Sequence, residues 1–337
     1  MRCYYIGRWL SGLSPNSLER SMQRQSASAF SPHIVQFITT DIMTLLSLAL
    51  LALTGAVSSH PTTNEHELAP RAIVAGKTFD RFVQIFLENQ DYSKAIKDTN
   101  LAYLASQGIS LSNYFAIRHP SQGNYVAAVG GNTFGVTGDG TYNIAATVPT
   151  VVDLLEAKGI SWSIYQEDMP YSGFTGNSPN AQGQTDYVRK HNPLISYKSI
   201  SNSPSRLAKT KNFTLFNQEL AANTLPQWMF ITPNMTNDGH DTSLSFAGNW
   251  ARNWLTPLLA NPKFNINRTL VILTFDEDSG TTTNRVYAVL LGSAIPTAKK
   301  GTTNLTTYGH YSLIKTVEVN WSLGNLGQGD VGANAFF

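Results

Sequence analysis

The chain has 337 residues, enough for one large α/β domain or two smaller ones, and 42% of them are hydrophobic, as in a globular protein. Charged residues make up 14%, the formal net charge is +2, and no basic stripe occurs, so we expect no nucleic-acid partner. The single cysteine, Cys3, lies close to the amino terminus, so the remaining chain has no disulfide, thiol nucleophile or cysteine-ligated zinc.

Residues 1–59 are expected to form a leader that contains a secretory signal peptide. The apolar stretch 45–53 is followed by small residues, among which Ala56-Val57-Ser58 fits a cleavage site. Either Met43 is the true start of the protein or the basic region before the apolar stretch is unusually long. The alternative to a cleaved signal peptide is an uncleaved membrane anchor over residues 34–57, and the charged Asp41 argues against it. We therefore expect a secreted protein, extracellular or in the cell wall, with no stable membrane insertion after cleavage.

The leader also accounts for the positive charge. It holds four of the 24 basic and two of the 22 acidic residues, which leaves 20 of each in the mature chain. Residues 60–74, which include Pro61 and Pro70, are expected to be a linker into the folded part.

Strand and helix patterns alternate through the rest of the chain. Apolar and β-branched runs predict strands at 81–87, 110–117, 161–166, 227–232, 269–275 and 285–291. Apolar residues at helical spacing predict helices at 93–107, 124–129, 150–158, 246–259 and 311–321. The alternation predicts an α/β fold around a mainly parallel sheet, in a single domain over residues 75–337.

Polar residues accumulate where four of these strands end. They are Glu88-Asn89, His119-Pro120-Ser121, residues 234–241 and Asp276-Glu277-Asp278. Each cluster alone has an ordinary explanation as a turn, a helix cap or a surface loop. Because the carboxyl ends of parallel strands meet at one edge of the sheet, the four together predict a single site.

The predicted chemistry of this site is phosphoryl transfer. Three adjacent carboxylates repel one another, so we expect a divalent metal ion to hold them. Such an ion lowers the pKa of a coordinated hydroxyl, here that of Ser121. A serine at a helix N-terminus also places phosphate against free backbone N–H groups.

At these residues the chain resembles the phosphoesterase family of secreted acid phosphatases and bacterial phospholipases C, within the alkaline-phosphatase-like superfamily. The likeness runs from about Phe82 to Phe337 and is greatest to fungal secreted acid phosphatases. The matching stretches are Leu87-Glu88-Asn89-Gln90-Asp91-Tyr92, His119-Pro120-Ser121-Gln122-Gly123-Asn124-Tyr125, residues 165–170, 189–193 and 230–241, Thr274-Phe275-Asp276-Glu277, and Tyr308-Gly309-His310-Tyr311-Ser312.

The resemblance implies a three-layer α/β/α sandwich with a metal-dependent site. In it Ser121 is the nucleophile and forms a phosphoserine, and His240 and His310 exchange protons. The metal positions are Glu88, Asn89, Asp276 and Glu277, and the substrate-binding positions are Asn124, His119, His191 and Asp241. The sequence departs from the family pattern at Gly123, where Pro is commoner, and at Gly309, where Asp is commoner.

The implied function is a secreted acid phosphatase that hydrolyses small-molecule phosphomonoesters. A phosphodiesterase of phospholipase C type, with a groove near residues 173–184, is the alternative, and a non-catalytic secreted glycoprotein is a third. Passage through the secretory route also predicts glycosylation at four of the five sequons, with Asn234 excluded by its place inside the motif. The predicted sites are Asn212, Asn267, Asn304 and Asn320.

Overall fold

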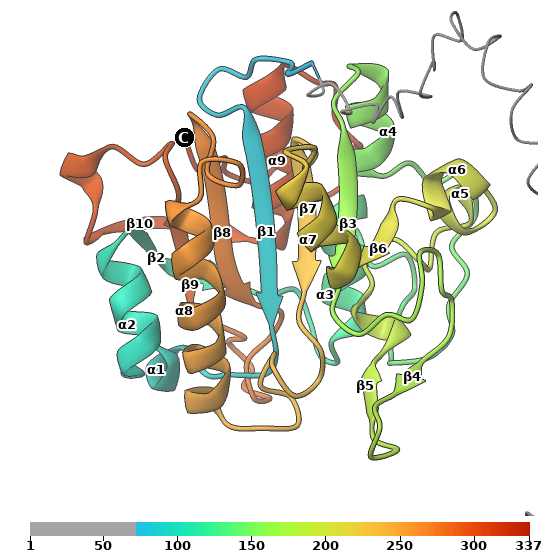
Figure 1. Ribbon diagram of the computed structural model, residues 1–337, viewed down its shortest axis with the longest axis horizontal. Coiled ribbons are helices and arrows are strands. Elements are labelled where there is room, and N and C mark those ends of the chain that lie inside the picture. The colour runs from blue at the N-terminus through green and yellow to red at the C-terminus, as the bar shows by residue number, and fades with distance from the viewer. Residues whose placement is uncertain (1–71) are drawn as a thin grey trace, which may run out of the picture. The chain divides into compact units, whose positions relative to one another are not determined.

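A central eight-stranded sheet organises the structure (Figure 1). The structure, a computed structural model, describes residues 72–337, so the predicted leader and residues 60–71 of the predicted linker lie outside the described residues. Among the described residues no helix has the length and apolarity needed to cross a bilayer. The strands in sheet order are β10 (Thr302–Gly309), β2 (Ile109–Phe115), β9 (Ala288–Leu291), β8 (Thr269–Phe275), β1 (Arg81–Leu87), β7 (Trp228–Thr232), β3 (Trp162–Gln166) and β6 (Thr210–Asn212).

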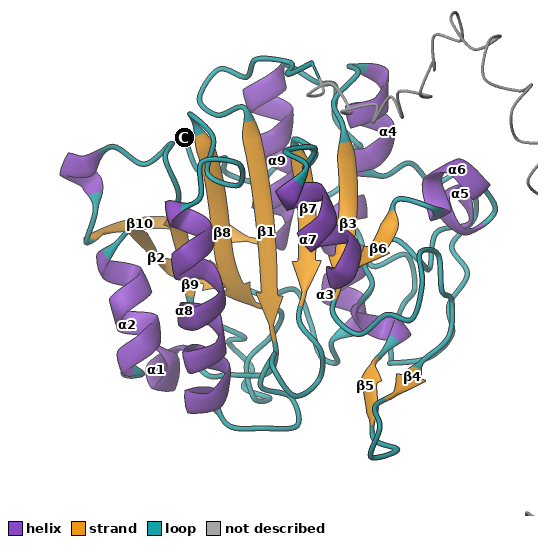
Figure 2. Ribbon diagram, in the orientation of Figure 1, coloured by secondary structure: helices purple, strands orange, loops and turns teal. Residues whose placement is uncertain are grey.

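The sheet is parallel except at one strand. β9 runs antiparallel to both of its neighbours, β2 and β8, while the other pairs are parallel. Helices lie on both faces of the sheet (Figure 2), which confirms the predicted α/β class with a mainly parallel sheet. The helices are α1 (Tyr92–Ala95), α2 (Thr99–Ser106), α3 (Gln122–Gly130), α4 (Val151–Ala157), α5 (Lys198–Ser201), α6 (Pro204–Leu207), α7 (Phe213–Ala221), α8 (Leu244–Ala260) and α9 (His310–Trp321).

Some elements differ from the sequence prediction for local reasons. The helix predicted at 93–107 is divided into α1 and α2, because the Asp98 side chain accepts hydrogen bonds from the Asn100 and Leu101 N–H groups and begins a new helix. The loop predicted at 173–184 contains β4 (Ser178–Pro179), which pairs with β5 (Thr185–Tyr187). Strand β10 was not predicted, because its Thr-rich sequence shows no apolar run.

The central strand β1 determines where the site forms. All seven of its residues are buried, and it pairs with β7 and β8 in register, so that Leu87 lies opposite Phe275. Beyond these strand ends the Asp276 N–H still donates to the Leu87 carbonyl at 2.9 Å, and the Glu88 N–H donates to the Asp238 carbonyl at 2.9 Å. Glu88, Asp238 and Asp276 therefore lie together at one edge of the sheet, beyond the ends of the adjacent strands β1, β7 and β8.

The other end of β1 is anchored by Arg81. Its guanidinium is buried and donates to four backbone carbonyls at 2.7–3.1 Å, those of Leu225, Pro226, Lys263 and Phe264. The loops before β7 and β8 are thus tied to the start of β1.

We expect Arg81→Met to lower the free energy of unfolding by about 2–4 kcal/mol, because four buried carbonyls lose their charged donor. Urea denaturation measures the effect, and Lys158→Met, which removes an exposed cation, is the control. Equal stability of the two variants would contradict the anchoring role.

Candidate active site

Ser121 lies at the start of α3, but its side chain does not cap the helix. No cap hydrogen bond is formed, and the hydroxyl donates instead to Glu88 Oε2 at 3.0 Å, with Glu277 Oε1 at 3.3 Å. Ser121 is 1% exposed. The ordinary explanation of this serine as a helix cap is therefore excluded, since its hydroxyl points between two carboxylates.

Three buried carboxylates surround this hydroxyl: Glu88 follows β1, and Asp276 and Glu277 follow β8. Burial raises the pKa of all three, and the charges of Glu88 and Glu277 raise the pKa of Asp276 further. Asn89 Oδ1 and Asp276 Oδ2 are buried and have no hydrogen-bond partner in the described part of the chain. Orphaned oxygens beside clustered carboxylates are what a hard divalent cation binds, so this predicted set fits such an ion.

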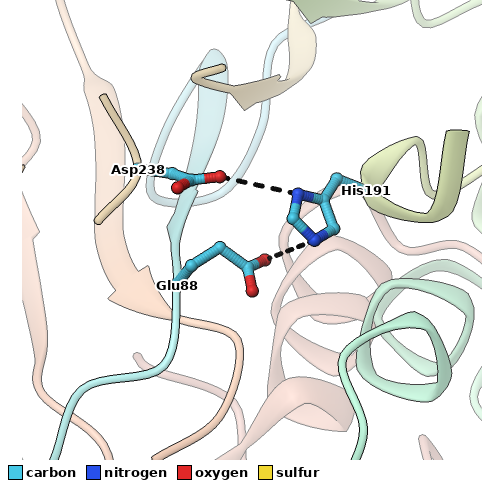
Figure 3. A group of neighbouring side chains, drawn as sticks. All are labelled: Glu88, His191 and Asp238. Carbon is cyan, nitrogen blue, oxygen red and sulfur yellow. Dashed lines mark ion pairs between the residues drawn. The ribbon is translucent and has the colours of Figure 1, made fainter. Parts of the chain in front are cut away.

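A second group of possible metal ligands, Glu88, His191 and Asp238, involves the other carboxylate oxygen of Glu88, Oε1 (Figure 3). His191 Nε2 is 3.2 Å from Glu88 Oε1, and its Nδ1 is 3.5 Å from Asp238 Oδ2. One ligand atom from each of these three residues lies within 4.8 Å of the others. Burial lowers the pKa of His191, which favours the neutral ring that binds a metal or donates one hydrogen bond.

Asp238 was missed as a site residue. The sequence Asp238-Gly239 is typical of a turn, and the Asp238 Oδ1 does accept the His240 N–H at 2.8 Å in that turn. Its other oxygen is buried and unpaired among the described residues. The available signal was its position within the polar stretch that follows β7.

His240 is the most accessible imidazole beside this second group. Its Nδ1 pairs with Asp241 Oδ1 at 2.7 Å, its ring lies 6.0 Å from that of His191, and its Nε2 makes no hydrogen bond to any described residue. Asp241, predicted to bind substrate, is 49% exposed and instead orients this ring. The imidazole is therefore free at one nitrogen and fixed at the other.

His310 has a different environment from that expected of an acid or base. It is fully buried, its Nε2 lies 2.6 Å from the Asp276 carbonyl, and its Nδ1 lies 3.1 Å from the Tyr114 hydroxyl. Burial lowers its pKa to about 4. Both ring nitrogens are engaged, so the predicted proton exchange is not available in this arrangement, and the ring instead fixes the backbone that carries Asp276.

His119 and Asn124 hold the Glu277 side chain. His119 Nδ1 is 3.0 Å from Glu277 Oε2, and the Asn124 amide donates to the same oxygen at 3.2 Å. Asn124 also accepts from the Ile117 and Arg118 N–H groups and donates to the Arg118 carbonyl. All of its bonding capacity is used, so a direct contact of Asn124 with substrate requires one of these bonds to break.

The two departures from the family pattern fit the local packing. A Cβ at Gly123 would lie 2.3 Å from Arg118 Cδ, and one at Gly309 would lie 2.7 Å from the Phe115 carbonyl oxygen. Gly309 pairs with Phe115 where β10 meets β2, so an aspartate at this position would require the backbone to shift.

The predicted glycosylation sites differ in access. Asn267 is exposed, while Asn212 and Asn304 are partly exposed. Asn320 is 4% exposed; its amide nitrogen donates to the Phe79 carbonyl and its oxygen accepts from Thr78 and Phe79. Because a glycan attaches to that nitrogen, glycosylation at Asn320 would require these buried hydrogen bonds to break.

Removal of metal is expected to change how stability depends on pH. Raised carboxyl pKa values mean that the metal-free fold is most stable below the unfolded values near 4 and loses stability as pH rises through the folded values. A bound cation favours the ionised carboxylates and removes this loss. Melting temperatures between pH 4.5 and 7.5, with and without a chelator, should diverge toward neutral pH; parallel curves would contradict the metal site.

The neighbours Asp276 and Asp278 are expected to respond differently to the same change. Asp278 accepts hydrogen bonds from the Gly280 and Thr281 N–H groups of the following turn, whereas Asp276 keeps an unpaired oxygen in the site. We expect Asp276→Asn to remove bound metal and Asp278→Asn to retain it, as measured by elemental analysis. Equal metal loss in both variants would contradict the assignment of Asp276 to the metal site and of Asp278 to the following turn.

Comparison with known proteins identifies the family of this chain. A model of the Phosphoesterase family matches residues 70–324. An acid phosphatase of Aspergillus fumigatus is 48% identical over 306 residues, covering 87% of this chain and 68% of the relative. A phosphate-repressible acid phosphatase of Penicillium chrysogenum is 48% identical over 297 residues, which cover 85% of this chain and 72% of the relative.

Among solved structures, a protein of the alkaline phosphatase superfamily from Vibrio parahaemolyticus superposes with a TM-score of 0.51 at 10% identity. The match covers 78% of this chain and 72% of that one, and at this identity it bears on the fold alone. The expected likeness to the alkaline phosphatase fold is thereby confirmed. The chain belongs to the phosphoesterase family.

Proposed function

We propose that this protein is an acid phosphatase that hydrolyses small-molecule phosphomonoesters with Ser121 as its nucleophile. The observation that carries the proposal is the Ser121 hydroxyl, which is directed at Glu88 and Glu277 rather than at its own helix. At the first turn of α3 this hydroxyl also lies beside backbone N–H groups suited to phosphoryl oxygens.

The class of the enzyme follows from its relatives. Proteins named acid phosphatase match over most of the chain at about half identity, so the predicted class, a phosphoric monoester hydrolase, is supported well beyond the site alone. The chemistry of individual residues is our inference from the geometry.

We propose that Glu88, Asn89, Asp276 and Glu277 hold a divalent cation. When bound, the ion supplies positive charge that favours the deprotonated Ser121 hydroxyl and offsets the charge of the phosphoryl oxygens. The orphaned oxygens of Asn89 and Asp276 support this assignment. His191 and Asp238 extend the donor set at the other carboxylate oxygen of Glu88, Oε1.

In the proposed reaction, Ser121 gives its hydroxyl proton to Glu88 Oε2, to which it already donates at 3.0 Å, and its Oγ forms a bond to phosphorus while the bond from phosphorus to the ester oxygen breaks. The free Nε2 of His240 protonates the departing alcohol. Water then attacks the phosphoserine and gives a proton to His240, while Glu88 returns its proton to Ser121 Oγ as the bond from Oγ to phosphorus breaks and phosphate is released. His310, His119 and Asn124 act as positioning residues, because their polar atoms hold Asp276 and Glu277.

Two further properties complete the proposal. The likeness to fungal acid phosphatases supports a secreted enzyme, with glycans at Asn212, Asn267 and Asn304. The diester alternative keeps the same centre and differs only in the substrate it accepts. A relative from Mycobacterium tuberculosis, 30% identical over 253 residues, is named a phosphatidylinositol-3-phosphatase, a name that also describes hydrolysis of a phosphomonoester.

Ser121→Ala is expected to lower kcat by at least about a thousandfold, because the nucleophile is lost while the fold remains. Ser163→Ala, which removes another buried serine hydroxyl from β3, is the matched control. Hydrolysis of p-nitrophenyl phosphate measures the loss, and intact-mass spectrometry after acid quenching should show a phosphorylated wild type only.

A substrate panel decides between the two reactions. We expect p-nitrophenyl phosphate to be hydrolysed faster than its bis ester and than phosphatidylcholine. Faster cleavage of either diester would replace the phosphatase proposal with the phosphodiesterase one, and unchanged activity of Ser121→Ala would remove the nucleophile assignment.

A further inference from the structure

Beside Ser121, one carboxylate joins two groups that are suited to binding an anion. Asp139 Oδ1 accepts the Gln122 backbone N–H at 3.1 Å, and Asp139 Oδ2 accepts from Lys190 Nζ at 2.9 Å. Gln122 is the first residue of α3 and directly follows Ser121. A carboxylate therefore lies against a helix N-terminus and an ammonium group at the position next to the nucleophile.

Lys190 lies next to the candidate active site in the sequence and in space, since it pairs with Asp139 and precedes His191. Its ammonium interacts with the charges of Glu88 and Asp276, the two carboxylates that end β1 and β8. It is also the residue before His191, which contacts Glu88 directly. Sequence reasoning did not assign Lys190 a role, because a lysine beside an arginine in a loop is typical of a solvated surface.

The Gln122 N–H and the Lys190 ammonium are both suited to bind the oxygens of a phosphoryl group. Backbone N–H groups at a helix N-terminus and a lysine ammonium are two standard donors to phosphate oxygens. The two oxygens of one carboxylate here take the places of two phosphoryl oxygens. A phosphomonoester dianion carries more charge than the Asp139 carboxylate, so it can compete for the same donors.

The segment that carries Asp139 is fixed by hydrogen bonds on its amino-terminal side and is loosely packed at the two glycines that flank the aspartate. The Arg118 guanidinium donates to the Val136 and Thr137 carbonyls, at 2.6 and 3.2 Å, and so fixes the segment just before Asp139. Gly138 and Gly140 flank the aspartate, and no atom lies closer than 3.5 Å to a Cβ built at either position. The backbone on either side of Asp139 is therefore loosely packed, while the Arg118 contacts hold the segment before it in place.

The structure points to an internal competitor: we propose that Asp139 occupies the phosphoryl subsite, formed by the Gln122 N–H and Lys190 Nζ, and that a substrate phosphate displaces it. The inference rests on the proposed function and adds to it a substrate-binding residue, Lys190, and a residue that limits affinity, Asp139. The alternative is that Asp139 holds Lys190 in place in the substrate complex as well. Removing the Asp139 charge should strengthen phosphate binding if Asp139 competes with phosphate, and should weaken it if Asp139 positions Lys190.

The test is the affinity of the metal-loaded full chain for inorganic phosphate, measured by titration calorimetry. We expect Asp139→Asn to lower the Kd by about three- to tenfold, because an amide competes less well for the ammonium. We expect Lys190→Met to raise the Kd by about tenfold or more, because a charged donor to phosphate is lost. Circular dichroism establishes that each variant is folded.

A closely matched control exists in the same chain. Asp153 also joins a helix-start N–H, that of Thr150 at 2.7 Å, to a basic side chain, that of Arg206 at 2.7 Å. Its side chain is 32% exposed, compared with 29% for Asp139. Asp153→Asn therefore removes the same charge from the same kind of bridge elsewhere, and Lys198→Met removes an exposed lysine; both should leave the Kd unchanged.

Weaker or unchanged phosphate binding in Asp139→Asn would overturn the competitor role, and unchanged binding in Lys190→Met would overturn the subsite. Hydrolysis of p-nitrophenyl phosphate by the wild type is measured in parallel. An active wild type with the wrong pattern of Kd values contradicts this inference alone. A wild type that hydrolyses no monoester contradicts the proposed function, while calorimetry still decides whether Asp139 and phosphate compete.

Discussion

Burial of like charges at the ends of three adjacent strands is the constraint on which the site depends. β1 is buried along its whole length between β7 and β8, so the residues that follow these strands enter a space that water reaches poorly. Glu88, Asp238 and Asp276 are all brought there, and burial raises the pKa of each carboxyl. Without a cation, burial opposes ionisation of these carboxyl groups. A bound divalent cation would make them its ligands, so the stability of the fold would depend on metal binding.

The residues around the carboxylates have mainly a positioning role. His310 fixes the backbone of Asp276, while His119 and Asn124 hold the Glu277 side chain. In the proposed mechanism, Ser121 makes the bond to phosphorus and the free nitrogen of His240 transfers protons. In the proposed arrangement the Asp139–Lys190 pair occupies the space in which a phosphoryl group would be recognised. The acid that competes with substrate is therefore separate from the carboxylates that repel one another in the metal-free site.

The sequence alone predicted the fold class and that the polar residues after several strands meet at one edge of the sheet. The long apolar strands at 81–87 and 269–275 were predictable because their patterns are strong, and the polar residues after them marked the edge where Glu88 and Asp276 meet. Asp238 and Lys190 were not predicted, because a turn dipeptide and a basic loop look ordinary in sequence. Only the tertiary structure buries Asp238 and pairs Lys190 with Asp139. The engagement of both His310 nitrogens, and the burial of Asn320, likewise depend on contacts between distant segments.

The most direct test of the central claim is an anomalous diffraction map of the protein crystallised with Mn²⁺. The account predicts a peak bounded by Glu88, Asn89, Asp276 and Glu277, within coordination distance of Ser121 Oγ. An ion bound only by Glu88, His191 and Asp238, or no peak at this edge of the sheet, would contradict the claim that these carboxylates activate Ser121.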